Sequence, residues 1–239
     1  MTGRFASMGL LSDARVLFAL ARGAVPGGTH ADRLARFYGP QANDYDRFRE
    51  RLLSGRRELV ESMPARRGAS IVELGGGTGR NVEFFADRLP QLENVYVVDL
   101  CEALLDVAKR RFRDARNVRP VLADATTWRP SAPVDCVYLS YALTMIPDWR
   151  AAVENALAML KPGGVLGVVD FHLAPGHGWL ARTFWRHWFA HDGVMLSAEH
   201  LPYLRTRLRT VTLEERRASV PYLPGLTVPY YLFVGRRQP

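Results

Sequence analysis

Residues 71–79 read Ile71-Val-Glu-Leu-Gly75-Gly-Gly-Thr-Gly79, an apolar run followed at once by a glycine-rich turn. The run Ser70–Leu74 predicts a short buried strand, and the spacing of Val82, Phe85 and Leu89 predicts a helix after the glycines. Glycines at such a turn let the backbone approach a ligand closely, and the N-terminus of the helix offers free N–H groups. This stretch therefore predicts a ligand-binding turn at the carboxyl end of a strand.

The alternation of strand and helix patterns continues along the chain. Further strands are predicted at Val95–Asp99, Pro120–Ala123, Val134–Ser140 and Val165–Phe171. Strands that alternate with helices at this spacing indicate βαβ units and a parallel sheet. The ending differs, because Leu208–Val220 and Leu226–Gly235 are two β-rich runs joined by a turn without a helix. They predict a hairpin of long strands appended to the sheet.

Composition sets outer limits on what the chain can be. Its 239 residues correspond to one large domain or two small ones, and 48% hydrophobic with 23% charged residues is a globular balance. Two cysteines exclude a disulfide scaffold and a zinc finger held by cysteines. The net charge of +8 is compatible with a nucleic acid, an anionic membrane or an acidic substrate, and it selects none of them.

An acidic residue accompanies the glycine turn. Asp99 stands twenty residues past Gly79, at the end of the second predicted strand, where a carboxylate can bind both ribose hydroxyls of an adenosine. The dinucleotide fingerprint would need glycine at the position of Arg80, and the Lys-Ser/Thr of a P-loop is absent. These departures disfavour NAD and nucleoside triphosphates as ligands.

Residues 70–171 resemble the class I S-adenosylmethionine-dependent methyltransferases, whose first motif matches Glu73-x-Gly75-x-Gly77-x-Gly79. The resemblance implies a three-layer α/β sandwich around a seven-stranded, mostly parallel, Rossmann-like sheet with one antiparallel strand. It implies S-adenosylmethionine as cofactor, with Asp99 at the ribose and Asp124 and Ala125 at the adenine. The expected cofactor contacts are Tyr38, Arg56, Glu73, Gly75, Gly77, Thr78, Asn81, Asp99, Leu100, Asp124, Ala125 and Ser140.

The identity of the methyl acceptor is predicted mainly from segments outside the glycine turn and the first strands. The run after Ser140 lacks the (Asn/Asp)-Pro-Pro-aromatic motif of enzymes that methylate amino groups of nucleic acids, so no nucleic-acid partner is expected. Tyr38–Arg57, Phe184–Phe189, His200–Arg205 and Val220–Tyr231 resemble the diacylglyceryl-homoserine N-methyltransferases of betaine lipid synthesis, a likeness that spans about residues 36–237. It implies three methyl transfers to the homoserine amine of a lipid, and a separate enzyme that makes diacylglyceryl-homoserine.

Three residues are the catalytic candidates: Tyr45, Asp46 and Tyr141. Aromatic faces bind quaternary ammonium groups well, and a carboxylate can accept the amine proton. Arg56 can pair with a carboxylate of the cofactor or substrate, and His172 is a further candidate base. Ordinary packing or a solvated helix surface explains each residue equally simply. A phosphatidylethanolamine or small-molecule methyltransferase, and a non-catalytic cofactor-binding module, remain as alternatives.

The expected organisation is an N-terminal helical lid over residues 1–64 and a methyltransferase domain over residues 65–239, with an acceptor-side insertion at 172–207. Residues 8–22 suit a bilayer surface, and the alternative is a helix packed on the domain or a frayed terminus. The Trp- and Arg-containing residues 177–191 suit a bilayer surface or, equally, packing on the core or on a second subunit. A cytoplasmic protein, peripheral on the inner face of the membrane, is expected. No metal is expected, and the oligomeric state is left open.

Overall fold

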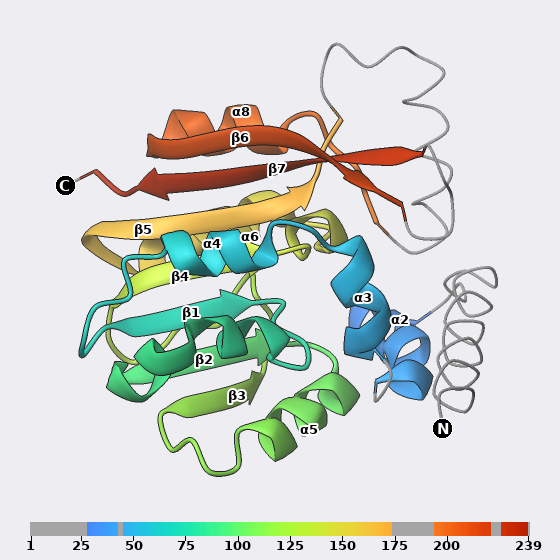
Figure 1. The fold of residues 1–239 in the computed structure, drawn as a ribbon, viewed down its shortest axis with the longest axis vertical. Coiled ribbons are helices and arrows are strands. Elements are labelled where there is room, and N and C mark those ends of the chain that lie inside the picture. The colour runs from blue at the N-terminus through green and yellow to red at the C-terminus, as the bar shows by residue number, and fades with distance from the viewer. Residues whose placement is uncertain (1–27, 43–44, 174–193, 221–225, 239) are drawn as a thin grey trace, which may run out of the picture.

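The computed structural model describes residues 28–42, 45–173, 194–220 and 226–238, with only the backbone at residues 41, 45 and 47–49. Its centre is a seven-stranded sheet in the order β3-β2-β1-β4-β5-β7-β6 (Figure 1). β1 to β5 run parallel, whereas β7 is antiparallel to both of its neighbours. The strands are β1 Ser70–Leu74, β2 Asn94–Asp99, β3 Val118–Leu122, β4 Val134–Ser140, β5 Leu160–Phe171, β6 Arg209–Ser219 and β7 Thr227–Arg236.

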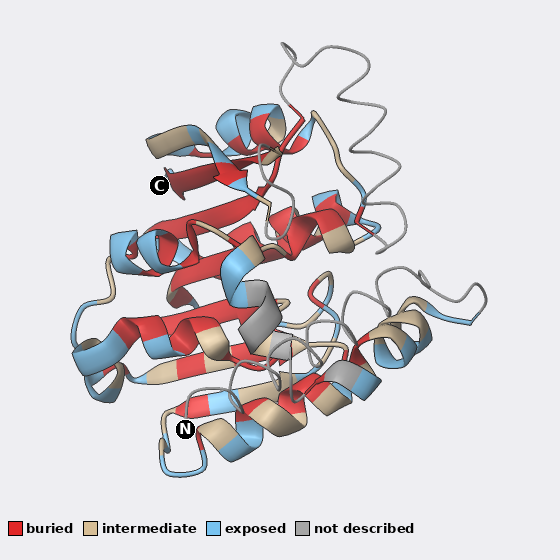
Figure 2. Cartoon of the chain, turned by 45° about the vertical axis from the view of Figure 1, so that its right-hand side comes forward, coloured by how far each residue is buried: buried red, intermediate tan, exposed pale blue. Residues whose placement is uncertain are grey.

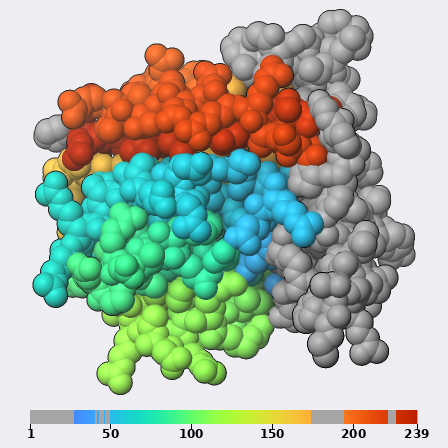
Figure 3. Space-filling model, viewed as in Figure 1, coloured from blue at the N-terminus to red at the C-terminus, as the bar shows by residue number. Residues whose placement is uncertain are grey.

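Helices cover both faces of this sheet and make the three layers that were expected. α4 (Arg56–Ser62), the 3-10 segment η2 (Arg80–Gln91) and α5 (Glu102–Arg111) pack on one face. α6 (Trp149–Met159) and α8 (His200–Arg207) pack on the other. The central strands are accordingly buried on both sides (Figure 2), as parallel strands between helices are. The space-filling view shows α4 and η2 in close contact over the front of the sheet (Figure 3).

The residues 31–64, predicted to be helical, form several short pieces. α2 (His30–Tyr38) begins at a capping box in which Thr29 and Asp32 satisfy each other's backbone N–H groups. The short η1 (Gly39–Gln41) follows, then α3 (Tyr45–Leu52) and α4. The chain breaks before α4 at Gly55, which has φ +82°. α2 and α3 lie beyond the arrowheads of the parallel strands, where ligands bind in open α/β sheets (Figure 1).

Two predicted elements differ from the structure. The segment after the glycine turn is 3-10 rather than α-helical, since Ala86 leaves the helical region (φ 47°) and Pro90 lacks an N–H donor. β5 begins at Leu160 instead of Val165, because residues 161–164, whose Pro-Gly-Gly sequence is typical of a turn, lie within the strand, where the pairing with β4 is irregular.

The two segments that were expected at a bilayer surface, residues 8–22 and 177–191, lie outside the described residues. Among the described residues, no helix combines the length and the apolar character that crossing a bilayer requires. The predicted hairpin is present as β6 and β7, and it extends the sheet beyond β5.

Candidate active site

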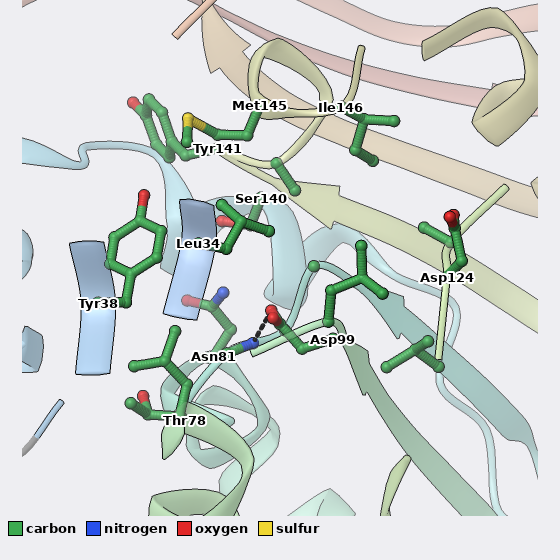
Figure 4. Close-up of a pocket in the computed structure, with 18 of the residues that line it drawn as sticks. Leu34, Tyr38, Thr78, Asn81, Asp99, Asp124, Ser140, Tyr141, Met145 and Ile146 are labelled. Carbon is green, nitrogen blue, oxygen red and sulfur yellow. Dashed lines mark hydrogen bonds between the residues drawn. The ribbon is translucent and has the colours of Figure 1, made fainter. Parts of the chain in front are cut away.

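A cavity of about 270 Å³ lies at the carboxyl edge of β1, β2 and β4, beneath α2 and α3 (Figure 4). Its walls combine the glycine turn, the tips of three strands and the loop that follows β4. Asp99 and Asp124 stand toward one end, whereas Tyr38, Tyr141 and Met145 gather toward the other (Figure 4). The cavity therefore joins an acidic end to an aromatic end.

The glycine turn adopts backbone conformations that L side chains rarely adopt. Gly75, Gly77 and Gly79 have φ values of +71°, +52° and +70°. A Cβ added at Gly75 would lie 2.4 Å from the Cβ of Ala142, in the loop after β4. The turn thus needs glycine for conformation and for its close approach to the neighbouring loop.

Asp99 ties the second strand to this turn. One carboxylate oxygen accepts the N–H of Gly77 at 2.8 Å, and the other accepts the N–H of Cys101 at 2.8 Å. Burial raises the pKa of Asp99, while these N–H donors oppose that shift. The N–H of Leu100 also opposes the shift. A carboxylate has about four acceptor positions, so acceptor capacity remains for a hydroxyl group of a ligand.

Asp124 and His30 stand at the adenine end expected from the resemblance. The side chain of Asp124 accepts the N–H and the hydroxyl of Thr126, each at 2.7 Å. His30 enters from α2, and burial lowers its pKa. α2 therefore contributes to the cavity at its Asp124 end as well as at its Tyr38 end.

Glu73 lies under the turn and not in the cavity wall. Its side chain is fully buried and accepts hydrogen bonds from Asn81 at 2.7 Å and from the Tyr138 hydroxyl at 2.9 Å. Burial raises its pKa to about 7, against those hydrogen bonds and the nearby Arg56. Asn81 does line the cavity, and its Oδ1 accepts a hydrogen bond from Arg56 at 3.3 Å. Glu73 thus orients Asn81 rather than contacting a ligand.

Ser140 and Tyr141 end β4 at the aromatic side of the cavity. Ser140 Oγ is buried and has no hydrogen-bond partner among the described residues. Tyr141 has φ +53°, an uncommon value for a bulky residue. Its hydroxyl donates to the carbonyl of Ser54 at 2.7 Å, and burial raises its pKa well above the ordinary value. Tyr141 consequently offers its ring to the cavity rather than a free base.

Asp46 of α3 also lines the cavity, with both carboxylate oxygens engaged. Oδ1 accepts the Thr78 hydroxyl at 2.6 Å, and Oδ2 is paired with Arg111 of α5. Since both oxygens already have donors, the geometry suits a positioning role for Asp46, whereas the sequence suggested a proton acceptor.

Most of the predicted site residues surround this one cavity. The exceptions are Glu73, described above, and Tyr45, whose side chain is not among the described ones. Sequence reasoning found Tyr38 of α2 and Tyr141 of the loop after β4, but it missed the other lining residues of these two segments. For the loop, the run that follows Ser140 was a usable signal, whereas no local motif marks α2. The missed lining residues include His30, Leu34, Leu53, Arg80, Leu104, Met145, Ile146 and Asp148.

Neither the candidate base His172 nor the thiol of Cys101 is among the residues that line the cavity. His172 is buried, and its Nε2 lies 3.0 Å from Glu215 Oε2 on β6. Cys101 is buried beside Tyr38 and Leu104, and burial raises its pKa. The described residues contain no group of three or more His, Cys, Asp or Glu side chains placed to hold a metal ion. His187 and His191, at metal-ligand spacing in the sequence, lie outside the described residues.

The chain is similar in sequence to known methyltransferases. Residues 71–164 match the methyltransferase domain family. Residues 71–164 thus carry a methyltransferase domain, on a sheet of the kind that the resemblance to class I enzymes implies. It is 35% identical over 126 residues to trans-aconitate 2-methyltransferase of Variovorax paradoxus, covering 52% of this chain and 47% of that protein. It is 30% identical over 169 residues to the ubiquinone/menaquinone biosynthesis C-methyltransferase UbiE of Ectopseudomonas mendocina, covering 67% and 66%.

Solved structures bear out the fold of this methyltransferase domain. Geranyl diphosphate C-methyltransferase of Streptomyces coelicolor, in complex with S-adenosyl-L-homocysteine, superposes with a TM-score of 0.66 at 17% identity, over 89% of this chain and 99% of that one. The [4+2]-cyclase SpnF gives 0.67 at 14% identity, over 90% and 99%. The chain spans about half the length of the trans-aconitate methyltransferases that it matches.

S-adenosylmethionine is the cofactor of this methyltransferase domain, and the cavity fits it. Asp99 retains acceptor capacity for a ribose hydroxyl, the glycine turn lines the cavity without side chains, and Asp124 stands at the end where the adenine is expected. When bound, the cofactor supplies a methyl group on a positively charged sulfur. The residues of the chain bind it, orient it and exclude water around it.

Proposed function

We propose that the chain transfers methyl groups from S-adenosylmethionine to the amine of a diacylglyceryl-homoserine lipid and completes diacylglyceryl-trimethylhomoserine. The observation that carries this proposal is the aromatic end of the cavity. Tyr38 and Tyr141 line it together with the carboxylate of Asp46, in the same cavity as Asp99. A growing ammonium cation is stabilised by aromatic faces and by a nearby negative charge.

Methyl transfer to an amine requires that the nitrogen attack the methyl carbon in its neutral, unprotonated form. An ammonium group loses one proton for each methyl group that it gains, so three transfers release three protons and end in a quaternary cation. Each pKa unit of the amine above the working pH costs about 1.4 kcal/mol. Ser140 Oγ, buried and without a partner among the described residues, can accept a hydrogen bond from that amine and orient its lone pair.

The homoserine headgroup also carries a carboxylate. Arg56 is buried in the cavity wall, where Nε donates to the carbonyl of Leu53 at 3.1 Å and Nη1 donates to Asn81. A guanidinium matches a carboxylate in shape and charge. Arg56 is therefore the group we assign to a carboxylate of either the headgroup or the cofactor.

The proposed acceptor is a lipid, so the chain must work at a membrane surface. We place it on the inner face of the membrane, held by the basic and aromatic residues 177–191 and by the net charge of +8. A separate enzyme would make the diacylglyceryl-homoserine. The relatives act on chemically different acceptors, as the names trans-aconitate methyltransferase and ubiquinone/menaquinone C-methyltransferase state. Family membership alone therefore leaves the acceptor open.

The purified chain with labelled S-adenosylmethionine tests the proposal on vesicles that contain diacylglyceryl-homoserine, on phosphatidylethanolamine vesicles and on trans-aconitate. We expect mono-, di- and trimethylated homoserine lipid and no comparable product from the others. Tyr38→Phe should retain the trimethylated product, whereas Tyr38→Leu should lose roughly tenfold in rate. Methylated product from phosphatidylethanolamine alone, or from trans-aconitate alone, would contradict diacylglyceryl-homoserine as the acceptor. Cofactor binding without any methylated product would favour a regulatory module.

A further inference from the structure

Five charged side chains join α3 to the body of the domain, and we call them the ionic seam: Asp46, Glu50, Arg80, Glu83 and Arg111. Asp46 and Glu50 are four residues apart, so they share one face of α3. Asp46 pairs with Arg111 of α5, and Glu50 Oε1 lies 2.6 Å from Arg80 at the start of η2. Glu83 lies between the two arginines, 2.5 Å from Arg80 and 3.6 Å from Arg111. The seam thus fastens one lid helix at two points.

Arg111 makes hydrogen bonds to the glycine turn in addition to its ion pair with Asp46. Besides Asp46, its Nη1 donates to the carbonyl of Thr78 at 2.6 Å and to the Thr78 hydroxyl at 3.2 Å. The Thr78 hydroxyl in turn donates to Asp46 at 2.6 Å. One guanidinium therefore holds a residue of the glycine turn and a residue of the lid against each other.

Arg111 itself does not line the cavity, although its partners Asp46 and Thr78 do. Thr78, Asp46 and Arg80 line the cavity, whereas Arg111 does not. The side chains of Arg111 and Asp46 are 19% and 21% exposed, so the pair is shielded more than an ordinary surface pair and is still reached by salt. Because α3 forms a wall of the cavity, opening the seam would widen the route by which a ligand enters and leaves.

We propose that Arg111 is a positioning residue for cofactor retention, which acts through Asp46 and Thr78 to close α3 on the glycine turn. The inference rests on cofactor binding and is independent of which acceptor the enzyme uses. It predicts that the seam opens when the cofactor exchanges. It also predicts that Arg111 influences how long the cofactor stays, although the side chain does not contact the cavity.

The test measures S-adenosylhomocysteine binding to the full chain by stopped-flow and calorimetry. Arg111→Met should raise the dissociation rate roughly tenfold, and Arg111→Lys should recover part of the loss. Salt should speed dissociation from the parent protein more than from Arg111→Met, in which the Glu50–Arg80 pair of the seam still joins α3 to the domain. Lys109→Met is the matched control, because Lys109 pairs with Asp106 on the exposed side of the same helix. It should behave as the parent does.

A double-mutant cycle separates this role from a general loss of stability. Asp46→Asn and Arg111→Met together should raise the dissociation rate no further than either change alone, because each opens the same contact. In the cofactor-free protein, amide hydrogen exchange in α3 should become faster in Arg111→Met and stay unchanged in Lys109→Met. Additive effects, or dissociation within twofold of the parent, would overturn the proposal. If Arg111→Met does not fold, Arg111→Lys and Asp46→Asn decide by the same readouts.

Discussion

Asp99 serves two partners at once, since its carboxylate accepts backbone N–H groups from Gly77 and Cys101 and retains acceptor capacity for a ribose hydroxyl. Asp99→Ala should therefore weaken S-adenosylhomocysteine binding by roughly a hundredfold, because hydrogen bonds to a charged group contribute about 1.5–3 kcal/mol each. Isothermal titration calorimetry measures this change. Asp106→Ala, an exposed carboxylate on α5, is the control and should bind normally. An unchanged affinity of Asp99→Ala would remove this residue from the cofactor site.

Glu73 makes stability depend on pH. Its pKa rises from 4.5 to about 7 on folding, so the folded protein binds the proton more tightly than the unfolded chain. Stability conferred by the protonated form is present below pH 4.5 and is lost as pH rises toward 7, in total about 3 kcal/mol. Glu73→Gln retains an acceptor for Asn81 and a partner for Tyr138 and should abolish that decline.

Urea unfolding of both proteins at pH 5 and pH 8 checks this prediction. Asp170, with a pKa raised by burial to about 6, contributes a decline of the same sign in both proteins. The comparison therefore concerns the difference between parent and Glu73→Gln. Equal losses of unfolding free energy between the two pH values would contradict the role of Glu73.

Some site residues were predictable because their contacts are local. Gly75, Gly77 and Asp99 belong to one strand–turn–helix unit and the strand beside it, so spacing alone brought them together. His30 and Leu34 reach the cavity only because α2 folds over the carboxyl edge, a tertiary contact with no local motif. For Glu73 the motif was visible, but β1 is buried on both faces, so alternation could not tell the cavity side from the interior.

At the scale of elements, the glycine turn allows the cost of a left-handed backbone to be separated from the cost of a steric clash with an added Cβ atom. Gly75 and Gly163 have similar φ values of +71° and +74°, but an added Cβ meets Ala142 at 2.4 Å at Gly75 and nothing within 4 Å at Gly163. Both alanine variants should lose about 1 kcal/mol for the left-handed backbone. Gly75→Ala should lose about 1–3 kcal/mol more by overpacking. Urea unfolding measures both, and equal losses would show that the close approach to Ala142 does not matter.

Strand positions were predictable from apolar runs with errors of a few residues at their ends. β4 has the predicted bounds, because its apolar run is preceded by Pro133 and ends at the polar Ser140. The helices were less predictable. The 3-10 character of η2 follows from Ala86 and Pro90 acting against an amphipathic pattern that is otherwise helical. The irregular start of β5 arises from its pairing with β4, which no single segment encodes.

The charge of the whole molecule bears on where it works. With 32 basic and 24 acidic residues, the chain should sediment with vesicles that contain anionic lipid. Raising the salt from about 0.05 to about 0.5 M should release it, because the Debye length falls several-fold. Vesicles of zwitterionic lipid are the control. The double variant Trp185→Ala, Trp188→Ala should bind more weakly if residues 177–191 enter the interface. Equal sedimentation with both lipids, or of variant and parent, would contradict the membrane proposal.

The strand order reverses between β1 and β4, so the two halves of the sheet contribute different parts of the site. β1, β2 and β3 present the groups suited to an adenosyl ligand, whereas Ser140 ends β4 on the opposite side and Tyr141 and Met145 follow it. Mutations on the later half can thus change which nucleophile is admitted while nucleoside recognition persists. A descendant of this chain with a new acceptor would be expected to differ mainly in α2, in α3 and after residue 140, and to keep its first three strands.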